Sequence, residues 1–304
     1  MRCITSLGLP LVILCLICFL FQAAPCHAAP APQGGSPGGK PPASPPVAPQ
    51  QQAIRPEALF AAMLVNAEKG QPQAMLTVGT LYEQGIGVPR NFTKALEWYT
   101  KAANAGDRDA WMSLGVCYEI GIGTTADPDK ALAAYTRSAS LGFHPAQYKL
   151  ADMYLKGRGV ARDESKGFDY LNKAAEGRES AAMFDMGVVL GDGLFGRKAE
   201  PEKARQWFTK AAEAGHAQSI LSLADMLKNG QGGKANPEEA LRWYLIGQKG
   251  GMSGEPLDAV IAELRDKLPV AKSREVEEAA DAWIAAKAKS QGQTQPRAQP
   301  EQGK

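Results

Sequence analysis

The chain has 304 residues, of which 44% are hydrophobic and 22% are charged, so it holds enough apolar side chains to bury a core. Its 34 basic and 32 acidic residues leave a formal charge of +2. This near balance gives no general attraction to nucleic acid or to an anionic membrane surface, and we expect neither as a partner.

Residues 1–28 are predicted to be a signal peptide. Arg2 supplies the positive start, residues 7–21 are almost entirely apolar, and the small residue Ala28 suits cleavage after it. The apolar run is shorter than the roughly 20 residues that a membrane-spanning helix needs. We therefore expect a periplasmic or secreted protein with no transmembrane segment in the mature chain. The alternative is lipid anchoring through Cys26, although Pro25 before it does not fit the small residue that such a site requires.

Two segments of biased composition flank the predicted folded region. Residues 29–55 are rich in proline, glycine and glutamine, and residues 290–304 are rich in glutamine. Neither segment has the apolar side chains for a core, so both are predicted to be disordered. Cys117 is the single cysteine beyond the signal region. One thiol cannot form an internal disulfide, so the fold is expected to depend on packing.

The strongest signal is an internal repeat with a period of about 36 residues, present five times over residues 72–250. Two repeat positions carry mostly aromatic residues: one holds Tyr82, Tyr118, Tyr154, Leu190 and Leu227, and the other holds Tyr99, Tyr135, Tyr170, Phe208 and Tyr244. In this alignment the third repeat is one residue short before Tyr170, and the fourth repeat carries an extra residue near Gly196.

Each repeat is predicted to be a pair of helices. In the first repeat the apolar residues fall on one helical face in two stretches, from Ala74 to Tyr82 and from Ala95 to Ala103. A Gly-x-Gly turn, which begins at Gly85 in this repeat, ends the first helix. A polar N-cap followed by proline, such as Asp127 in the second repeat, begins the second helix.

The flanks of the repeats are predicted to be caps. Residues 56–71 match the second helix of a repeat that lacks its first helix, and residues 251–289 contain two further amphipathic helices. A solenoid must cover both ends of its continuous core, so atypical terminal units are expected. The predicted fold class is all-α, a right-handed α-solenoid of about five tandem helix-turn-helix repeats with helical caps.

These residues resemble the Sel-one-like repeat (SLR) family, a branch of the tetratricopeptide superfamily. Residues 110–123 carry the first half of its pattern, Ala-x-x-x-Leu-Gly-x-x-Tyr-x-x-Gly-x-Gly, and residues 94–106 carry the second half, Lys-Ala-x-x-Trp-Tyr-x-x-Ala-Ala and Gly. The resemblance implies an adaptor or assembly role. A bacterial branch of the family, with paired cysteines in every repeat, has been linked to β-lactam binding or hydrolysis, but this chain lacks those pairs. A secreted effector that docks on host proteins is the other alternative.

No catalytic, cofactor-binding or metal-binding site is predicted. Residues 191–196 read as G-x-G-x-x-G, but a helix precedes them instead of the strand that a dinucleotide site needs. Residues 34–38 match the nucleophile motif G-x-S-x-G inside the proline-rich segment, where no strand or helix would hold the serine. His144 and His216 fall in turns two repeats apart, too far from each other to share one ion. Cys117 falls at an apolar core position, so we expect its thiol to be buried. Because none of these motifs forms a catalytic site, we expect a non-enzymatic protein.

The predicted binding surface lies on the first helix of each repeat, which lines the concave face of tetratricopeptide-like solenoids. An apolar row recurs there, formed by Leu76, Met112, Tyr148, Phe184 and Leu221. If the row faces the groove, its side chains would anchor a peptide or helix, and the neighbouring carboxylates of Asp152 and Asp225 would select it. In the alternative interpretation the row packs between helices. The predicted function is a protein–protein interaction scaffold of the bacterial cell envelope, with a partner whose identity the sequence leaves open.

Overall fold

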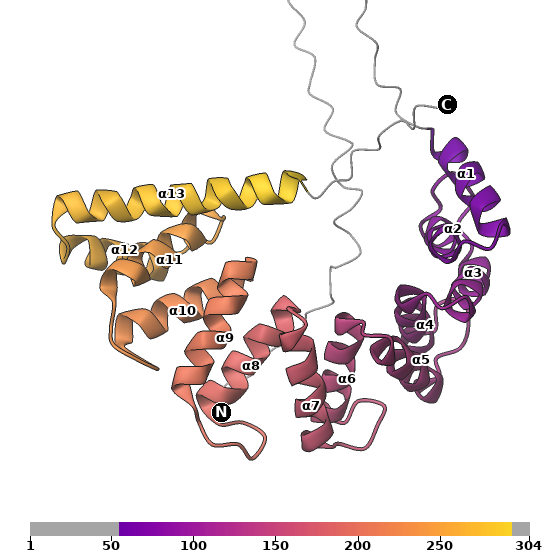
Figure 1. The fold of residues 1–304 in the computed structure, drawn as a ribbon, viewed down its shortest axis with the longest axis horizontal. Coiled ribbons are helices and arrows are strands. Elements are labelled where there is room, and N and C mark those ends of the chain that lie inside the picture. Colours follow the sequence, from indigo (N-terminus) through magenta and orange to yellow (C-terminus); the bar gives the residue numbers. More distant parts are fainter. Residues whose placement is uncertain (1–54, 294–304) are drawn as a thin grey trace, which may run out of the picture. The chain divides into compact units, whose positions relative to one another are not determined.

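The computed structural model describes residues 55–293, which belong to the second of two compact units, Ala53–Lys304. The predicted signal peptide, the predicted linker up to residue 54 and the tail beyond residue 293 lie outside the described residues. Over the described range the chain forms thirteen α-helices and no strand (Figure 1). None of these helices is long and apolar enough to cross a membrane.

Ten of the helices alternate as the first and second helix of a repeat, here called helix A and helix B. The A helices are α2 (Pro72–Gln84), α4 (Arg108–Ile120), α6 (His144–Lys156), α8 (Ser180–Asp192) and α10 (Ala217–Asn229). The B helices are α3 (Phe92–Asn104), α5 (Pro128–Ser140), α7 (Glu164–Glu176), α9 (Pro201–Ala214) and α11 (Pro237–Lys249). The flanking helices are α1 (Pro56–Glu68), α12 (Glu255–Asp266) and α13 (Val270–Gln293).

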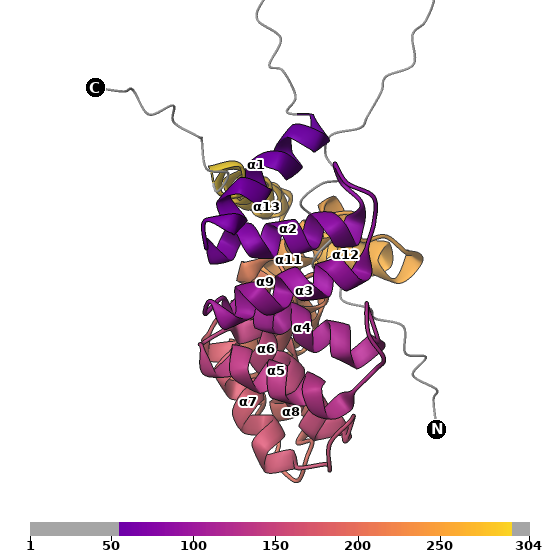
Figure 2. The same cartoon turned by 90° about the vertical axis from the view of Figure 1, so that its right-hand side faces the viewer.

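The helices pack in chain order. Every A helix packs against its own B helix and against the helix that precedes it, which is α1 for α2 and a B helix for the others. The first repeats are seen stacked in this way in Figure 2. Because each repeat touches only its neighbours, the apolar core is continuous but one repeat wide. The predicted fold class, an all-α solenoid of tandem helix pairs with helical caps, is confirmed.

Backbone chemistry sets the helix boundaries. Every helix A ends at a glycine in the left-handed conformation, the residues being Gly85, Gly121, Gly157, Gly193 and Gly230. Four of the five B helices begin directly after an N-cap residue whose side chain accepts a hydrogen bond from a backbone N–H of the first turn. These N-cap residues are Asn91, Asp127, Asp163 and Asn236. These capping bonds satisfy donors that a helix N-terminus leaves unpaired, and they confirm the predicted helix starts.

Close contact between helices A and B depends on a glycine. The Tyr135 ring is fully buried and lies so near Gly115 that a Cβ atom there would sit 2.3 Å from the ring's Cε1 atom. The rings of Tyr99 and Phe208 approach Gly79 and Gly187 in the same way. The aromatic ring thus fills the space left by the missing side chain, as close packing of the interior requires.

The third repeat differs from the predicted alignment. Leu171, which is 1% exposed, occupies the place that Tyr135 has in the second repeat, whereas Tyr170 is half-buried and stacks on Tyr154 at 5.9 Å. The interpretation of this repeat as one residue short is therefore wrong. Ala151 stands where the second repeat has Gly115. Its methyl group takes up space that a tyrosine ring would need, and the smaller leucine fits.

The second glycine of the Gly-x-Gly turn brings consecutive repeats together. A Cβ atom at Gly123 would lie 2.4 Å from the carbonyl oxygen of Phe92, the first residue of α3. Gly87 approaches the carbonyl oxygen of Pro56 in α1 equally closely, because its Cβ would lie 2.1 Å away. Helix α1 therefore takes the place of a helix B whose helix A is missing.

At the other end, α13 packs mainly against α11. The indole rings of Trp243 and Trp283 meet edge to face, with centroids 5.6 Å apart. Lys272 of α13 pairs with Glu238 of α11 at 3.4 Å. Helix α13 thus covers an apolar surface of the last repeat, and it continues to Gln293, past residue 289 where the cap was expected to end.

Substituting Gly115 with alanine tests the glycine–aromatic contact. The added methyl group would overlap the Tyr135 ring, so we expect Gly115→Ala to lower the free energy of unfolding by about 1–3 kcal/mol, the usual cost of overpacking. Denaturant titration followed by circular dichroism measures the change.

Two further variants control this result. In Gly191→Ala the new methyl group meets only the Ala204 Cβ at 3.5 Å, an ordinary contact, so stability should be unchanged or slightly raised. Adding Tyr135→Leu to Gly115→Ala recreates the pair found in the third repeat, and the two changes together should cost less than the sum of the single changes. Strict additivity would contradict the steric explanation.

Candidate protein-binding surface

The predicted apolar row lies on the helices A, one residue per repeat. All five members, which are Leu76, Met112, Tyr148, Phe184 and Leu221, are half-buried. Each packs partly against a core cluster and keeps part of its side chain accessible to solvent. We call the solvent-facing side of α2, α4, α6, α8 and α10 the helix-A face. The row is therefore shared between the helix-A face and the contacts between helices.

The aromatic members of the row contact residues of their own repeat and of the next repeat. The Phe184 ring lies 5.6 Å from the Phe208 ring and 4.9 Å from the His216 ring, measured between centroids. The Tyr148 hydroxyl of α6 donates a hydrogen bond of 2.8 Å to the Asp185 carboxylate of α8. These contacts fix the orientation of both rings, so the accessible part of each ring is presented in one conformation.

The two carboxylates predicted to flank the row already have partners within the chain. Asp152 forms ion pairs with Lys156 and with Arg158, the latter at 3.2 Å. Asp225 accepts a hydrogen bond from the Tyr244 hydroxyl. Both carboxylates are therefore partly neutralised or bound before any partner arrives.

Sequence reasoning missed a recurrent tyrosine–carboxylate hydrogen bond. Tyr99 donates to Glu83, and Tyr135 donates to Glu119 at 2.6 Å, so the tip of each buried ring reaches a carboxylate on helix A. Burial raises the pKa of the Tyr135 hydroxyl well above its usual range, and the Glu119 carboxylate adds to the rise. The signal in the sequence was the acidic residue that precedes each of these tyrosines by 16 positions.

The Asp185 carboxylate is half-buried. Burial raises its pKa, while the hydrogen bond from Tyr148 and the charge of Lys156 oppose the rise. The group lies between α6 and α8, where it links the third and fourth repeats. Its environment is that of a structural hydrogen-bond acceptor.

The other residues considered for chemistry have structural roles. Cys117 is 2% exposed, and burial raises the pKa of its thiol to about 12. His216 caps α10 by accepting the Ser219 backbone N–H, and burial lowers its pKa, which favours the neutral ring. His144 is the first residue of α6, with its Nδ1 atom 3.1 Å from the Gln147 side chain. The described part of the chain contains no group of three potential metal ligands.

The G-x-G-x-x-G match at residues 191–196 covers the last two residues of α8 and the turn after it, so a helix precedes the match, as expected. Residues 34–38, with the G-x-S-x-G match, lie outside the described range.

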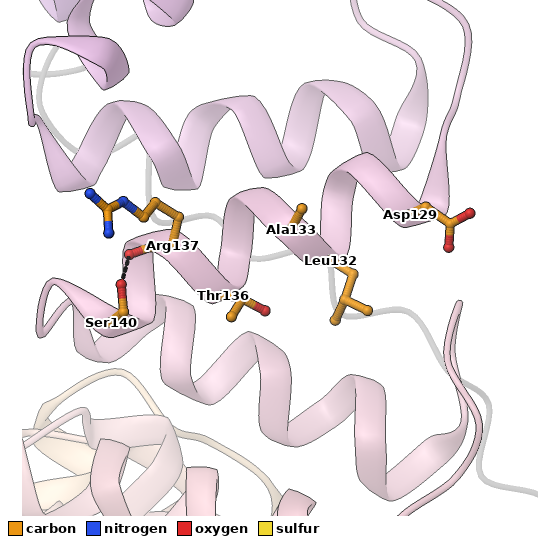
Figure 3. Close-up of a pocket in the computed structure, with 6 residues that line it drawn as sticks. All are labelled: Asp129, Leu132, Ala133, Thr136, Arg137 and Ser140. Atoms are coloured by element: carbon orange, nitrogen blue, oxygen red, sulfur yellow. Dashed lines mark hydrogen bonds between the residues drawn. The ribbon is translucent and has the colours of Figure 1, made fainter.

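A shallow depression lies along one side of α5 (Figure 3). All of its lining residues come from this one helix, at the spacing of an exposed helical stripe: Asp129, Leu132, Ala133, Thr136, Arg137 and Ser140. The Ser140 hydroxyl is engaged with the backbone carbonyl of Arg137 at 2.7 Å. This stripe lacks the convergent polar groups from several elements that ligand sites typically have.

Comparison with known proteins identifies the repeat. A model of the Sel1 repeat matches five segments, residues 72–107, 112–143, 144–178, 180–216 and 217–247. The chain belongs to the Sel1 repeat family. Sel1 repeats generally mediate protein interactions and serve as non-enzymatic scaffolds. Among curated proteins, no sequence matches this chain.

Solved structures of other Sel1-type proteins share the fold. One is a protective antigen of uropathogenic Escherichia coli with an SLR fold, 30% identical over 76% of this chain, with a TM-score of 0.58. Another is a Sel1 repeat protein from Oxalobacter formigenes, 27% identical over 67% of this chain, with a TM-score of 0.62. This chain spans 49% of the first protein's length and 58% of the second's.

The buried thiol gives a direct test of the packing around the second repeat. In a chain that begins at Ala29, Cys117 is the single cysteine. We expect no reaction with a thiol reagent at about pH 8 in the folded protein, because the reactive thiolate is scarce and access is blocked. Denaturation should release one reactive equivalent. Rapid reaction of the folded protein would show that the side of α4 that carries Cys117 is not buried.

Proposed function

We propose that this chain is a non-enzymatic scaffold of the bacterial cell envelope, which binds a peptide or protein through the concave, helix-A face of its solenoid. The observation that carries the proposal is the row of five half-buried residues, one on each helix A. A row that repeats with the solenoid forms a stripe suited to an extended segment or a helix. The Sel1 repeat family supports the scaffold role.

The location is proposed from the N-terminal sequence. An apolar stretch after Arg2 and a small residue at the end of residues 1–28 fit export and cleavage. The fold is compatible with an oxidising compartment, because Cys117 is buried and the packing of the repeats uses no disulfide among the described residues.

Mass spectrometry of the protein purified from its native host tests the location. We expect a mature N-terminus near Ala29 and no lipid, since Ala28 suits the cleaving peptidase. Cell fractionation should recover the mature form outside the inner membrane. An intact N-terminus would contradict export, and a lipid on Cys26 would replace the soluble form with an anchored one.

The double substitution Tyr148→Ala with Phe184→Ala tests the binding face. Aromatic anchors at the centre of an interface commonly contribute more than about 2 kcal/mol to binding, so the variant should lose capture of partners from an envelope extract. Circular dichroism should show that helical content is retained at low temperature.

The matched control for this test is Tyr99→Ala. Tyr99 is 2% exposed and packs against Gly79 in the first repeat, so its removal lowers stability and leaves Tyr148 and Phe184 in place. We expect this variant to have a lower melting temperature than the wild type and still to capture the partner. If both variants lose capture in proportion to their loss of stability, the row is a packing feature and the proposal is contradicted.

A further inference from the structure

One large apolar side chain on the helix-A face is mostly exposed to solvent. Ile120 ends α4 and is 62% exposed. The same position at the end of the other A helices carries a polar or charged residue, in turn Gln84, Lys156, Asp192 and Asn229. The solenoid therefore does not need an apolar side chain here. An isolated exposed isoleucine is ordinary, so its surroundings decide whether it marks a site.

Ile120 continues an apolar stripe that begins in the core. Met112 and Val116 precede it by two turns and by one turn on the same side of α4. Both are half-buried and pack against the core cluster that contains Ala146 and Leu150 of the third repeat. The stripe thus extends from the half-buried Met112 and Val116 to the exposed Ile120. A partner that covers the stripe would bury a continuous apolar surface.

The charges beside this stripe lie in ion pairs, and at the end of α6 the cations are the more exposed partners. Glu119, next to Ile120, is bridged at 2.9 Å to Lys149 of α6, which links the stripe to the third repeat. One turn further along α6, Asp152 is held between Lys156 and Arg158. The Asp152 side chain is 20% exposed, whereas those of Lys156 and Arg158 are 55% and 60% exposed. At the end of α6 solvent therefore meets mainly positive charge, although the sequence pointed to selection by the carboxylates. In the Glu119–Lys149 pair the two side chains are similarly exposed, at 34% and 27%.

We propose that the second and third repeats form a docking site for a peptide segment in which a large apolar side chain is flanked by acidic residues. The apolar side chain covers Ile120 and Val116, and the acidic residues approach Lys156 and Arg158. This inference rests on the proposed function and adds the chemistry of the partner. Charge complementarity of this kind selects partners and speeds their encounter more than it raises affinity.

The experiment uses a displayed library of random linear peptides, panned on the full mature protein. Peptides enriched on the wild type should combine an aromatic or large aliphatic residue with neighbouring aspartate or glutamate. Synthetic copies should bind roughly tenfold or more weakly to Ile120→Gln, which restores the residue type of the first repeat, because a central anchor is lost. Raised salt should weaken binding of the acidic peptides further, since their charges become screened.

Leu194→Gln is the matched control. Leu194 is 39% exposed in the turn of the fourth repeat, so the same kind of change is made away from the proposed site and should leave peptide binding unaltered. Both variants should keep the wild-type melting temperature because both side chains are exposed. Enrichment of basic peptides, or equal binding to wild type and Ile120→Gln, would overturn the site while leaving the scaffold function standing. If no peptide is enriched, peptide binding by the helix-A face is contradicted as well.

Discussion

The distance between helix A and helix B within a repeat is the constraint on which the rest of the structure depends. Three repeats set it by placing a glycine against an aromatic ring, as Gly115 does against Tyr135. The alanines that accompany the ring in helix B, such as Ala131 and Ala139, are buried and let the backbones approach. With little apolar volume per residue, such a core is stable only because small and large side chains alternate across the contact. The repeat therefore tolerates compensating changes better than single ones.

The same contact also shapes the surface. Because the tyrosine ring packs against a glycine of helix A, its hydroxyl reaches a carboxylate on that helix, as Tyr135 reaches Glu119. A buried phenol needs such an acceptor, and a half-buried carboxylate gains a donor from it. Polar groups on the helix-A face are thus positioned by the core. On the proposed binding face, Asp152 is 20% exposed within its ion pairs, whereas its partners Lys156 and Arg158 are 55% and 60% exposed.

The sequence predicted the period, the helix pairs, the Gly-x-Gly turns and the N-caps because each depends on local chemistry. Asp127 before a proline can be interpreted without knowing its neighbours in space. The third repeat could not be aligned correctly, since Tyr170 matched the pattern by type while Leu171 matched it by packing against Ala151. The tyrosine–carboxylate bonds and the partners of Asp152 were missed for a related reason. They depend on which side chains reach across from another helix, so the 16-residue spacing of Glu119 and Tyr135 is informative only once the pairing of the helices is known.

The contact made by the second turn glycine has a consequence for how such a chain can change its length. Gly123 lies against the carbonyl of Phe92 and Gly87 against that of Pro56, so these two junctions share one contact, whereas Gly159 of the third repeat meets only side chains. Duplicating the second repeat would therefore join ends that already fit each other. A gene encoding this chain can gain a repeat there by recombination without having to evolve a new interface. The reach of the proposed binding face would then grow in steps of one repeat.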